Sequence, residues 1–348
     1  MRPTGVFLSL AFLLFFPKSI CNGQPGPEPL ISEFIFTEAP FRSCHASTIT
    51  EAPDGRLMAA WFGGEDEGAD NVEIWMSEKT GEAAWSAPRA MTSYPNMPCW
   101  NPVLFRDSSN RIWLFFKVGP NPQSWTGAYR ILEGSIWGEV QYLPAGLLGP
   151  IRNKPITLAN GDILAPTSVE SGYRGGTPAD APSRSWASWV EVSSDGGKTW
   201  ARHGPITVPG QNFGVIQPTV WEVTPGHLVM LMRSSLRIGA ICRSESRDGG
   251  KTWEPARPTA LPNPNSGVDA VKLKDGRVAL VYNHTRFGRS PLNVAFSSDN
   301  GLTWDKPVVL ENQPGEYSYP AVIQSSDGLL HITYTWKRQR IKHVVLKP

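Results

Sequence analysis

The sequence is short of charged residues, of cysteine and of long hydrophobic runs. Charged residues make up 18% of its 348 residues, the formal net charge is only +2, and no segment is rich in lysine and arginine. A nucleic-acid partner is therefore not indicated, because such proteins present clustered positive charge. Beyond the N-terminal segment only Cys44, Cys99 and Cys242 remain. At most one disulfide can form among them, so we expect the fold to depend on its hydrophobic core.

The longest apolar run, residues 6–16, lies near the N-terminus and follows Arg2. Its eleven residues are too few to span a bilayer. This pattern is typical of a cleaved signal peptide, and we expect one over residues 1–23, a secreted or periplasmic protein, and no membrane span. Ile20 before Cys21 is a poor fit to lipoprotein processing, so simple export is favoured.

Glycine, proline and tryptophan are plentiful, with 33, 32 and 14 residues, as suits many short strands joined by tight turns. Three octapeptides read S-x-D-x-G-x-T-W and begin 53 and 51 residues apart, at 193–200, 246–253 and 297–304. Asp and Gly favour a tight turn, and the Trp that follows packs its ring under it. A fixed period in this range indicates stacked or radially arranged repeats.

A second signal, a turn followed by an apolar strand, recurs six times at intervals of about 50 to 65 residues. The turns lie at 54–55, 110–111, 160–161, 226–227, 275–276 and 327–328. Six units with room for four strands each predict an all-β, six-bladed β-propeller. We expect it to be a single domain over residues 36–348, after a Pro-rich lead-in at 24–35. Two packed β-sandwiches are the alternative, which the uniform period disfavours.

The octapeptides resemble the Asp-box (BNR) repeat of the sialidase superfamily, whose members are six-bladed β-propellers. The boxes lie at turns, so we assign them a structural role. The resemblance implies one site at the hub, where three arginines grip a substrate carboxylate, since the guanidinium fork binds a carboxylate best. It also implies a Tyr nucleophile with a Glu partner, and an Asp acid/base. No cofactor or metal is implied.

Two arginines match the family's carboxylate-binding positions. Arg289 lies eight residues before the Ser of the last box, and Arg233 ends the apolar strand 227–233. The nucleophile position falls on Tyr319, eight residues before Asp327. Tyr317 competes if the local Tyr-Ser pair is matched instead, but the turn fixes the strand register and favours Tyr319.

The acid/base position falls on Asp70, in the loop 63–71. Such a glycine-bracketed acidic loop could equally be solvated or bind a cation such as calcium. Its spacing from the position of the first arginine resembles that of the family, which favours catalysis. Other polar stretches could line the same cleft: Asn153-Lys154, Glu170, Asn263 to Asp269 and Asn283-His284.

Two positions depart from the family pattern. Counting ten residues back from Gly55, where the first arginine is expected, gives His45, while Arg42 is three residues away. Counting sixteen back from Arg233, where the Glu is expected, gives Gln217, which cannot take a proton from Tyr. His45 could act as a cation for the carboxylate, as a neutral general base, or as a core histidine satisfied by backbone.

Three functions follow from this combination. The first is an exo-acting glycosidase of the sialidase type that removes a terminal acidic sugar, sialic acid or a uronate, from a glycan. The second is a polysaccharide lyase acting on a uronate, with His45 or Tyr319 as the base, which the two departures favour. The third is a glycan-binding propeller without catalysis. In each case the partner is an acidic glycan.

Overall fold

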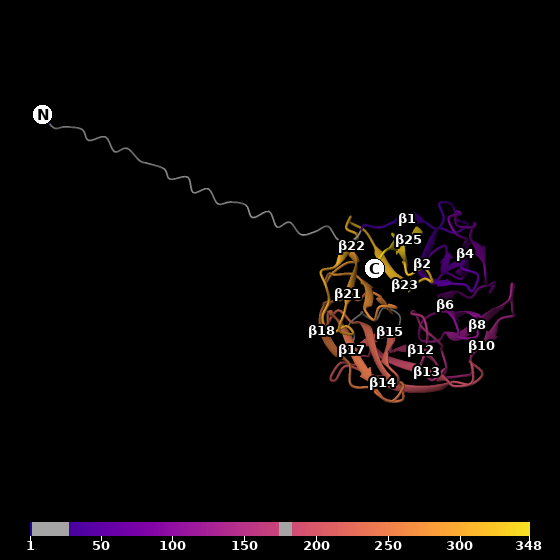
Figure 1. Cartoon of the computed structure of the whole chain (residues 1–348). Helices are drawn as coiled ribbons and strands as arrows, with labels where there is room; N and C mark the ends of the chain where they lie inside the picture. Colours follow the sequence, from indigo (N-terminus) through magenta and orange to yellow (C-terminus); the bar gives the residue numbers. More distant parts are fainter. Residues whose placement is uncertain (2–27, 174–182) are drawn as a thin grey trace.

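The structure, a computed structural model, describes residues 1, 28–173 and 183–348, which form strands and turns without a helix. The strands make six antiparallel sheets arranged as blades around a common centre (Figure 1). This confirms the six-bladed propeller that the repeated turns predict, and the alternative of two sandwiches is wrong. Apart from Met1, the predicted signal peptide lies outside the described residues.

Five blades are each built from one continuous stretch of chain, with the first strand of each toward the hub. Blade 1 contains β2 (Ser43–Glu51), β3 (Leu57–Gly64), β4 (Glu73–Lys79) and β5 (Arg89–Ala90). Blade 2 contains β6 (Cys99–Arg106), β7 (Ile112–Val118), β8 (Thr126–Glu133), β9 (Ile136–Trp137) and β10 (Gln141–Tyr142). Blade 3 contains β11 (Ile156–Thr157), β12 (Ile163–Ser171), β13 (Ser185–Ser193) and β14 (Ala201–Ile206).

The next two blades follow the same order. Blade 4 contains β15 (Val215–Thr224), β16 (His227–Ser234), β17 (Ala240–Ser246) and β18 (Arg257–Pro262). Blade 5 contains β19 (Asp269–Lys272), β20 (Val278–Tyr282), β21 (Leu292–Ser297) and β22 (Val308–Glu311).

Blade 6 joins the two ends of the described chain. It contains β23 (Tyr317–Gln324), β24 (Leu330–Trp336) and β25 (Arg340–Leu346), and its outer strand is β1 (Ile31–Phe34). Ile31 pairs with Val345 and Phe34 with Lys342 in antiparallel register. The ring is thus closed by an N-terminal strand. The blades begin before residue 36, the expected start of the propeller, because four residues of the expected lead-in form β1.

The hydrophobic core lies between neighbouring blades. Second strands are buried along almost their whole length, as in β3, where all eight residues are buried. Between blades 1 and 2, for example, Met58 and Phe62 of one blade pack with Leu104 and Phe116 of the next. Burial of such apolar strands against each other supplies the main driving force for folding. The three described cysteines are buried and free, so no disulfide joins them.

The three Asp-boxes lie at the turns between the third and fourth strands of blades 3, 4 and 5. In the first box, Asp195 Oδ1 accepts hydrogen bonds from the backbone N–H groups of Lys198 and Thr199, at 3.0 and 2.9 Å. Its Oδ2 accepts from the Thr199 hydroxyl at 2.6 Å. Trp200 Nε1 donates to the Gly197 carbonyl at 3.1 Å. These contacts hold the turn and give the box no contact with the hub.

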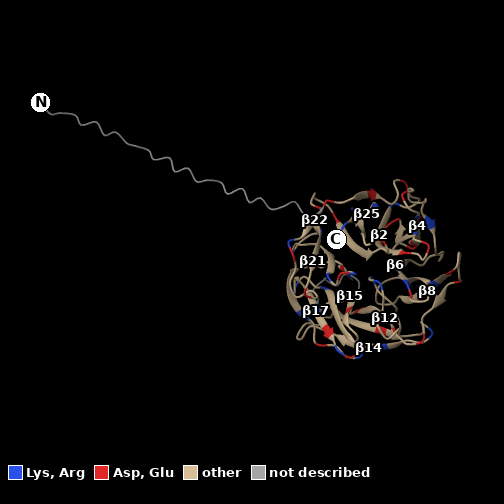
Figure 2. Cartoon of the chain, in the orientation of Figure 1, with Lys and Arg blue, Asp and Glu red and all other residues tan. Residues whose placement is uncertain are grey.

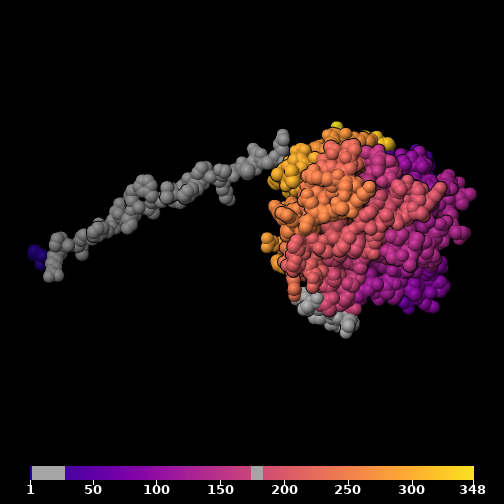
Figure 3. All heavy atoms as spheres, turned by 90° about the horizontal axis from the view of Figure 1, so that it is seen from below, coloured from indigo at the N-terminus to yellow at the C-terminus, as the bar shows by residue number. Residues whose placement is uncertain are grey.

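Successive blades pack side by side around the molecule, as the colours of the space-filling view show (Figure 3). Lysine and arginine alternate with aspartate and glutamate around the outer loops (Figure 2). No helix in the described ranges is long and apolar enough to cross a membrane.

Candidate functional site

One position in each blade lies at the hub, nine residues before the turn that joins the two innermost strands of that blade. The turn residues are 55, 110, 161, 226, 276 and 328. The corresponding hub positions are, in the same order, Ala46, Asn101, Arg152, Gln217, Gly267 and Tyr319. Four of them have positive φ, namely Ala46 (58°), Asn101 (43°), Gln217 (54°) and Tyr319 (52°). The strand register shifts at each of these four points. A β-bulge re-aims a side chain, and here the bulges allow Gln217 and Tyr319 to meet.

The hydroxyl of Tyr319 lies at the centre of this ring and accepts two hydrogen bonds. Arg233 Nη1 donates to Tyr319 Oη at 2.8 Å, and Gln217 Nε2 donates to it at 3.1 Å. Arg233 Nη1 also donates to Gln217 Oε1 at 3.0 Å, and its Nε donates to Asn265 Oδ1 at 2.7 Å. A negative charge developing on Tyr319 Oη is therefore stabilised by a guanidinium group.

Tyr319 and Tyr317 lie in different environments. Tyr317 packs in the core between blades 5 and 6, in the same cluster as Tyr334 and Leu292. Tyr319 instead faces the hub, so the turn was the better guide to register than the local Tyr-Ser pair.

Arg152 is a further hub arginine that the sequence reasoning missed. Its Nη2 donates to the carbonyls of Tyr319 and Pro320, the latter at 2.8 Å, although they lie on another blade. Its Cζ is 5.1 Å from the centre of the Tyr319 ring. Its Nε and Nη1 are buried and have no hydrogen-bond partner in the described part of the chain, and burial lowers its pKa to about 10. Counting nine residues back from Gly161 would have found it.

Arg289 lies on another flank of the ring, with its Cζ 5.6 Å from the Tyr319 ring centre. Its Nη1 donates to Glu316 Oε1 at 2.9 Å, and Arg338 Nε donates to the same oxygen at 2.9 Å. Arg338 also pairs with Glu67. Burial opposes ionisation of Glu316, but the charges of Arg289 and Arg338 outweigh it and lower the pKa of that carboxyl.

The hub is positively charged. Arg152, Arg233, Arg289 and Arg338 surround it. The ion pairs that these four make with described residues involve only Glu67 and Glu316. Nη2 of Arg233 has no hydrogen-bond partner among the residues that the structure describes. The arrangement leaves guanidinium groups available to an anionic ligand.

His45 packs directly against Tyr319, with ring centres 4.1 Å apart and planes at 50°. It is 1% exposed, and both ring nitrogens are buried without a hydrogen-bond partner among the residues that the structure describes. Burial lowers its pKa well below the ordinary value, and the charge of Arg338, then those of Arg289, Arg152 and Arg233, lower it further. His45 is therefore neutral at neutral pH and does not replace the charge of the missing arginine. Nor does backbone satisfy its nitrogens.

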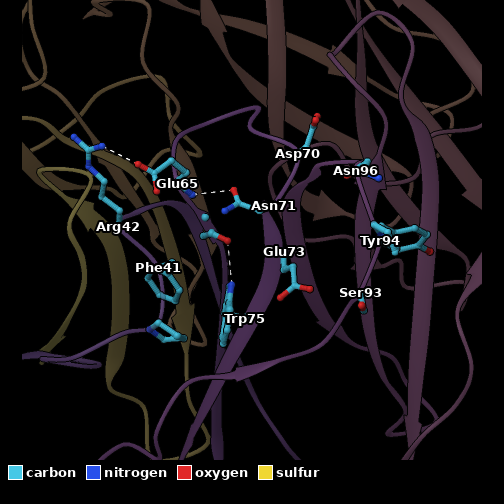
Figure 4. Close-up of a pocket in the computed structure, with 14 residues that line it drawn as sticks. Phe41, Arg42, Glu65, Asp70, Asn71, Glu73, Trp75, Ser93, Tyr94 and Asn96 are labelled. Atoms are coloured by element: carbon cyan, nitrogen blue, oxygen red, sulfur yellow. Dashed lines mark hydrogen bonds and ion pairs between the residues drawn. The ribbon is translucent and has the colours of Figure 1, made fainter.

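Asp70 lies beside the hub rather than against Tyr319. It is exposed and lines a cavity of about 450 Å³ on blade 1 together with Glu65, Glu73 and Trp75. Figure 4 shows its carboxylate directed away from Glu73 and Trp75. Among the described residues, Asp70 has no hydrogen bond to Tyr319. The loop that carries it does extend to the hub, because Glu67 pairs with Arg338.

The other polar stretches have mainly structural partners. Asn153 Nδ2 donates to the carbonyls of Gln217 and Pro218, at 3.2 and 3.0 Å, and so holds the bulge of β15. Lys154 Nζ pairs with Asp269 at 2.8 Å. No group of three or more His, Cys, Asp or Glu suited to a metal ion occurs within the described ranges.

The BNR repeat-like domain family matches residues 55–332, which is most of the sequence. The chain belongs to this family. It is similar to a sialidase of Bacteroides fragilis (strain YCH46), at 29% identity over an alignment of 198 residues that covers 54% of this chain and 33% of the relative. It is also similar to a sialidase of Micromonospora viridifaciens, at 22% identity over 352 residues, covering 89% of this chain and 53% of the relative. The chain spans between about a third and about half of the length of these relatives.

Solved structures share the fold. The Hadza microbial sialidase Hz136 has a TM-score of 0.71 at 20% identity, covering 88% of this chain and 66% of that one. A Dyadobacter fermentans protein of unknown function has a TM-score of 0.76 at 18% identity, covering 93% and 99%. The chain is a BNR-repeat member of the sialidase superfamily with its six-bladed propeller. Identities this low establish the fold alone.

Proposed function

We propose that this BNR-repeat protein is an exo-acting glycosidase that removes a terminal acidic sugar, a sialic acid or a uronate, from a glycan. The observation that carries this proposal is the Tyr319 hydroxyl held by Arg233 at 2.8 Å, with Arg289 beside the same ring. Arginines and a tyrosine meet where the family resemblance implies a carboxylate-binding catalytic site.

In this proposal Arg233 and Arg289 bind the carboxylate of the sugar, and Tyr319 Oη faces the anomeric carbon. With a sialic acid as substrate, a phenol suits this position because the carboxylate attached to the anomeric carbon repels an Asp or Glu nucleophile. Gln217 donates a hydrogen bond to the phenol oxygen instead of accepting its proton. Activation of Tyr319 then comes from Arg233, which stabilises negative charge on that oxygen. Asp70 is the acid that the sequence suggests.

A second candidate is β-elimination on a uronate, and one observation favours it. The Tyr319 hydroxyl has an amide and a guanidinium as its hydrogen-bond partners and no carboxylate. In an elimination Tyr319 would remove the proton next to the carboxylate, which the arginines make more acidic by neutralising its charge. No glycosyl-enzyme is needed for this reaction.

Incubation with sialosides and with uronate-capped oligosaccharides distinguishes these functions. Release of a saturated acidic sugar by the wild type, and its loss in Tyr319→Phe, is the expected result. A new absorbance from an unsaturated uronate would establish the lyase instead. Binding without turnover of any of these substrates would make the protein a glycan-binding propeller and contradict the proposal.

A further inference from the structure

Glu170 lies on the same side of its strand as the hub-lining residues. It is on β12, nine residues after the turn glycine Gly161, whereas Arg233 is on β16, seven residues after Gly226. An even difference of two residues keeps a side chain on the same face of a strand. Glu170 therefore lies on the equivalent face of the equivalent strand in the neighbouring blade, two residues farther from its turn than Arg233 is.

A chain of contacts links Glu170 to the hub. Its Oε2 accepts a hydrogen bond from Tyr173 Oη at 2.8 Å, and Tyr173 Oη accepts one from Trp186 Nε1 at 3.0 Å. The Trp186 ring centre lies 5.4 Å from Cζ of Arg233, whose Nη1 bonds the Tyr319 hydroxyl. The Glu170 carboxyl thus belongs to the wall of the site in which Arg233 and Tyr319 lie.

Its surroundings favour the protonated carboxyl. Burial raises the pKa of Glu170, against the charge of Arg233 and the hydrogen bonds of Tyr173 and Trp186. Glu316, a second and partly buried glutamate near the hub, has a lowered pKa because Arg289 and Arg338 outweigh its burial. A general acid must carry its proton at the working pH, and Glu170 meets that requirement better than Glu316 does. Asp70, by contrast, is exposed to solvent in the cavity on blade 1.

We infer that Glu170 is the general acid and base of the hub site, acting on the oxygen that links the acidic sugar to the rest of the glycan. This inference rests on the proposed hydrolase. Glu170 gives its proton to the glycosidic oxygen as the bond from that oxygen to the anomeric carbon breaks, and the bonding electrons leave with the oxygen. Water then adds to the anomeric carbon. Its released proton passes to the Glu170 carboxylate and restores the acid.

The test compares two substrates that share the acidic sugar and differ in the leaving group. One is an oligosaccharide, whose sugar leaving group needs protonation, and the other is a 4-nitrophenyl glycoside, whose leaving group does not. Glu170→Gln should lower kcat on the oligosaccharide by about 100-fold or more and on the aryl glycoside by less than about tenfold. Glu82→Gln, an exposed glutamate on the turn after β4, is the matched control and should change neither.

Thermal unfolding of Glu170→Gln shows whether that variant is folded. A second measurement tests the assignment of the acid itself: kcat/KM is recorded against pH for the wild type and for Tyr173→Phe. Losing the Tyr173 hydroxyl removes a donor to the ionised carboxylate, so the descending alkaline limb should move to higher pH. If the alkaline limb of the pH profile stays in place or moves to lower pH, it reports the titration of another group, and the inference is overturned.

The remaining outcomes are also decisive. If Glu170→Gln lowers kcat equally on both substrates, Glu170 has a structural role and does not protonate the leaving group. The leaving-group pattern appearing in Asp70→Asn and not in Glu170→Gln would assign the acid to Asp70. Either result overturns the inference and leaves the hydrolase standing. Absence of hydrolysis by the wild type on both substrates overturns the proposed function, and the inference with it.

Discussion

The chemistry of the hub depends on which groups surround the Tyr319 hydroxyl. The family resemblance implies a glutamate at the position of Gln217. The side-chain amide of Gln217 cannot accept the phenol proton, as a carboxylate could. Here the phenol oxygen accepts from Arg233 and Gln217, and Arg152 supports the backbone carbonyl of the same residue from another blade. Tyr319 thus accepts hydrogen bonds at both its side chain and its main chain, which suits the negative charge that the proposed reaction would place on its hydroxyl oxygen.

The carboxylate-binding role of Arg289 can be tested by a change that preserves charge. Arg289→Lys removes the planar fork that binds a carboxylate through two parallel hydrogen bonds. We expect kcat/KM on an acidic substrate to fall at least about tenfold, and much less on the methyl ester of the same substrate. Steady-state kinetics on the two substrates provides the measurement. Equal losses on both would mean that Arg289 is a scaffold for Glu316.

His45 predicts a pH-dependence of stability. Because the folded-state pKa of His45 is lowered by burial and by Arg338, its contribution to stability is fully present above the unfolded pKa of about 6.5. It is lost as the pH falls below that value, at up to about 1.4 kcal/mol per pH unit. Chemical denaturation between pH 7 and 5 should show a shallower decline for His45→Gln than for the wild type. Parallel declines would contradict the neutral, buried state.

At the scale of structural elements, the Asp-boxes join neighbouring blades. Arg111 Nη2 of blade 2 donates to the Gly196 carbonyl of the first box at 2.8 Å. A Cβ atom added at Gly197 would lie 2.5 Å from Cη2 of Trp113, again on blade 2. The second box is similarly close to blade 3, since a Cβ at Gly250 would lie 2.6 Å from Leu164. Each of these turns therefore fits against the preceding blade.

Two adjacent glycines separate the cost of backbone strain from the cost of this contact. Gly196 and Gly197 both have positive φ, 72° and 90°, but a Cβ at Gly196 would approach nothing closer than 3.6 Å. Gly197→Ala should lower Tm clearly more than Gly196→Ala, because the stacked Trp113 ring cannot move aside easily. Thermal unfolding of the two variants is the measurement. Equal changes in Tm would mean that the close packing of Gly197 against Trp113 of blade 2 does not contribute to stability.

Removing the box carboxylate should affect stability and not catalysis. Asp195→Ala breaks hydrogen bonds to two backbone N–H groups and to the Thr199 hydroxyl, so we expect a lower Tm. The value of kcat should be nearly unchanged in the folded fraction, because the box has no contact with the hub. Hydrogen bonding by Thr199 lowers the pKa of Asp195 to about 2. The stability that the ionised Asp195 contributes is therefore fully present above about pH 4, and it is lost as the pH falls from there toward the folded-state pKa of about 2. A stable but inactive variant would contradict the structural role.

For the whole molecule, closure of the ring depends on β1. This strand pairs with β25 and gives blade 6 its fourth strand, and the Glu33 carboxylate pairs with Lys79 of blade 1 at 2.8 Å. Without β1, β25 becomes an open edge, and such edges promote aggregation.

Two truncations test this closure. A chain of residues 28–348 retains β1, whereas a chain of residues 36–348 lacks it. The longer chain should unfold cooperatively and elute as a single species. The shorter one should have a lower Tm and form aggregates, as measured by thermal unfolding and size-exclusion chromatography. Identical behaviour would mean that three strands suffice in blade 6.

Local signals in the sequence determined the repeat architecture and part of the site. The end of the apolar strand 227–233 gave Arg233 as a candidate. Counting back from Asp327 gave Tyr319, and counting back from Gly55 gave His45. These positions are readable because each depends on one strand and its own turn. The turn within the first box is similarly local, since its internal hydrogen bonds join residues at most four apart.

Only the tertiary structure decided what depends on contacts between blades. Arg152 bonds residues 167 and 168 positions away, and Gln217 meets Tyr319 across 102 positions, so no local pattern pairs them. The protonation state of His45 follows from burial and from four arginines on other blades. The pairing of β1 with β25 joins opposite ends of the described chain. A closed ring brings distant residues together at its centre, and their burial and charge there decide the chemistry that the sequence alone leaves open.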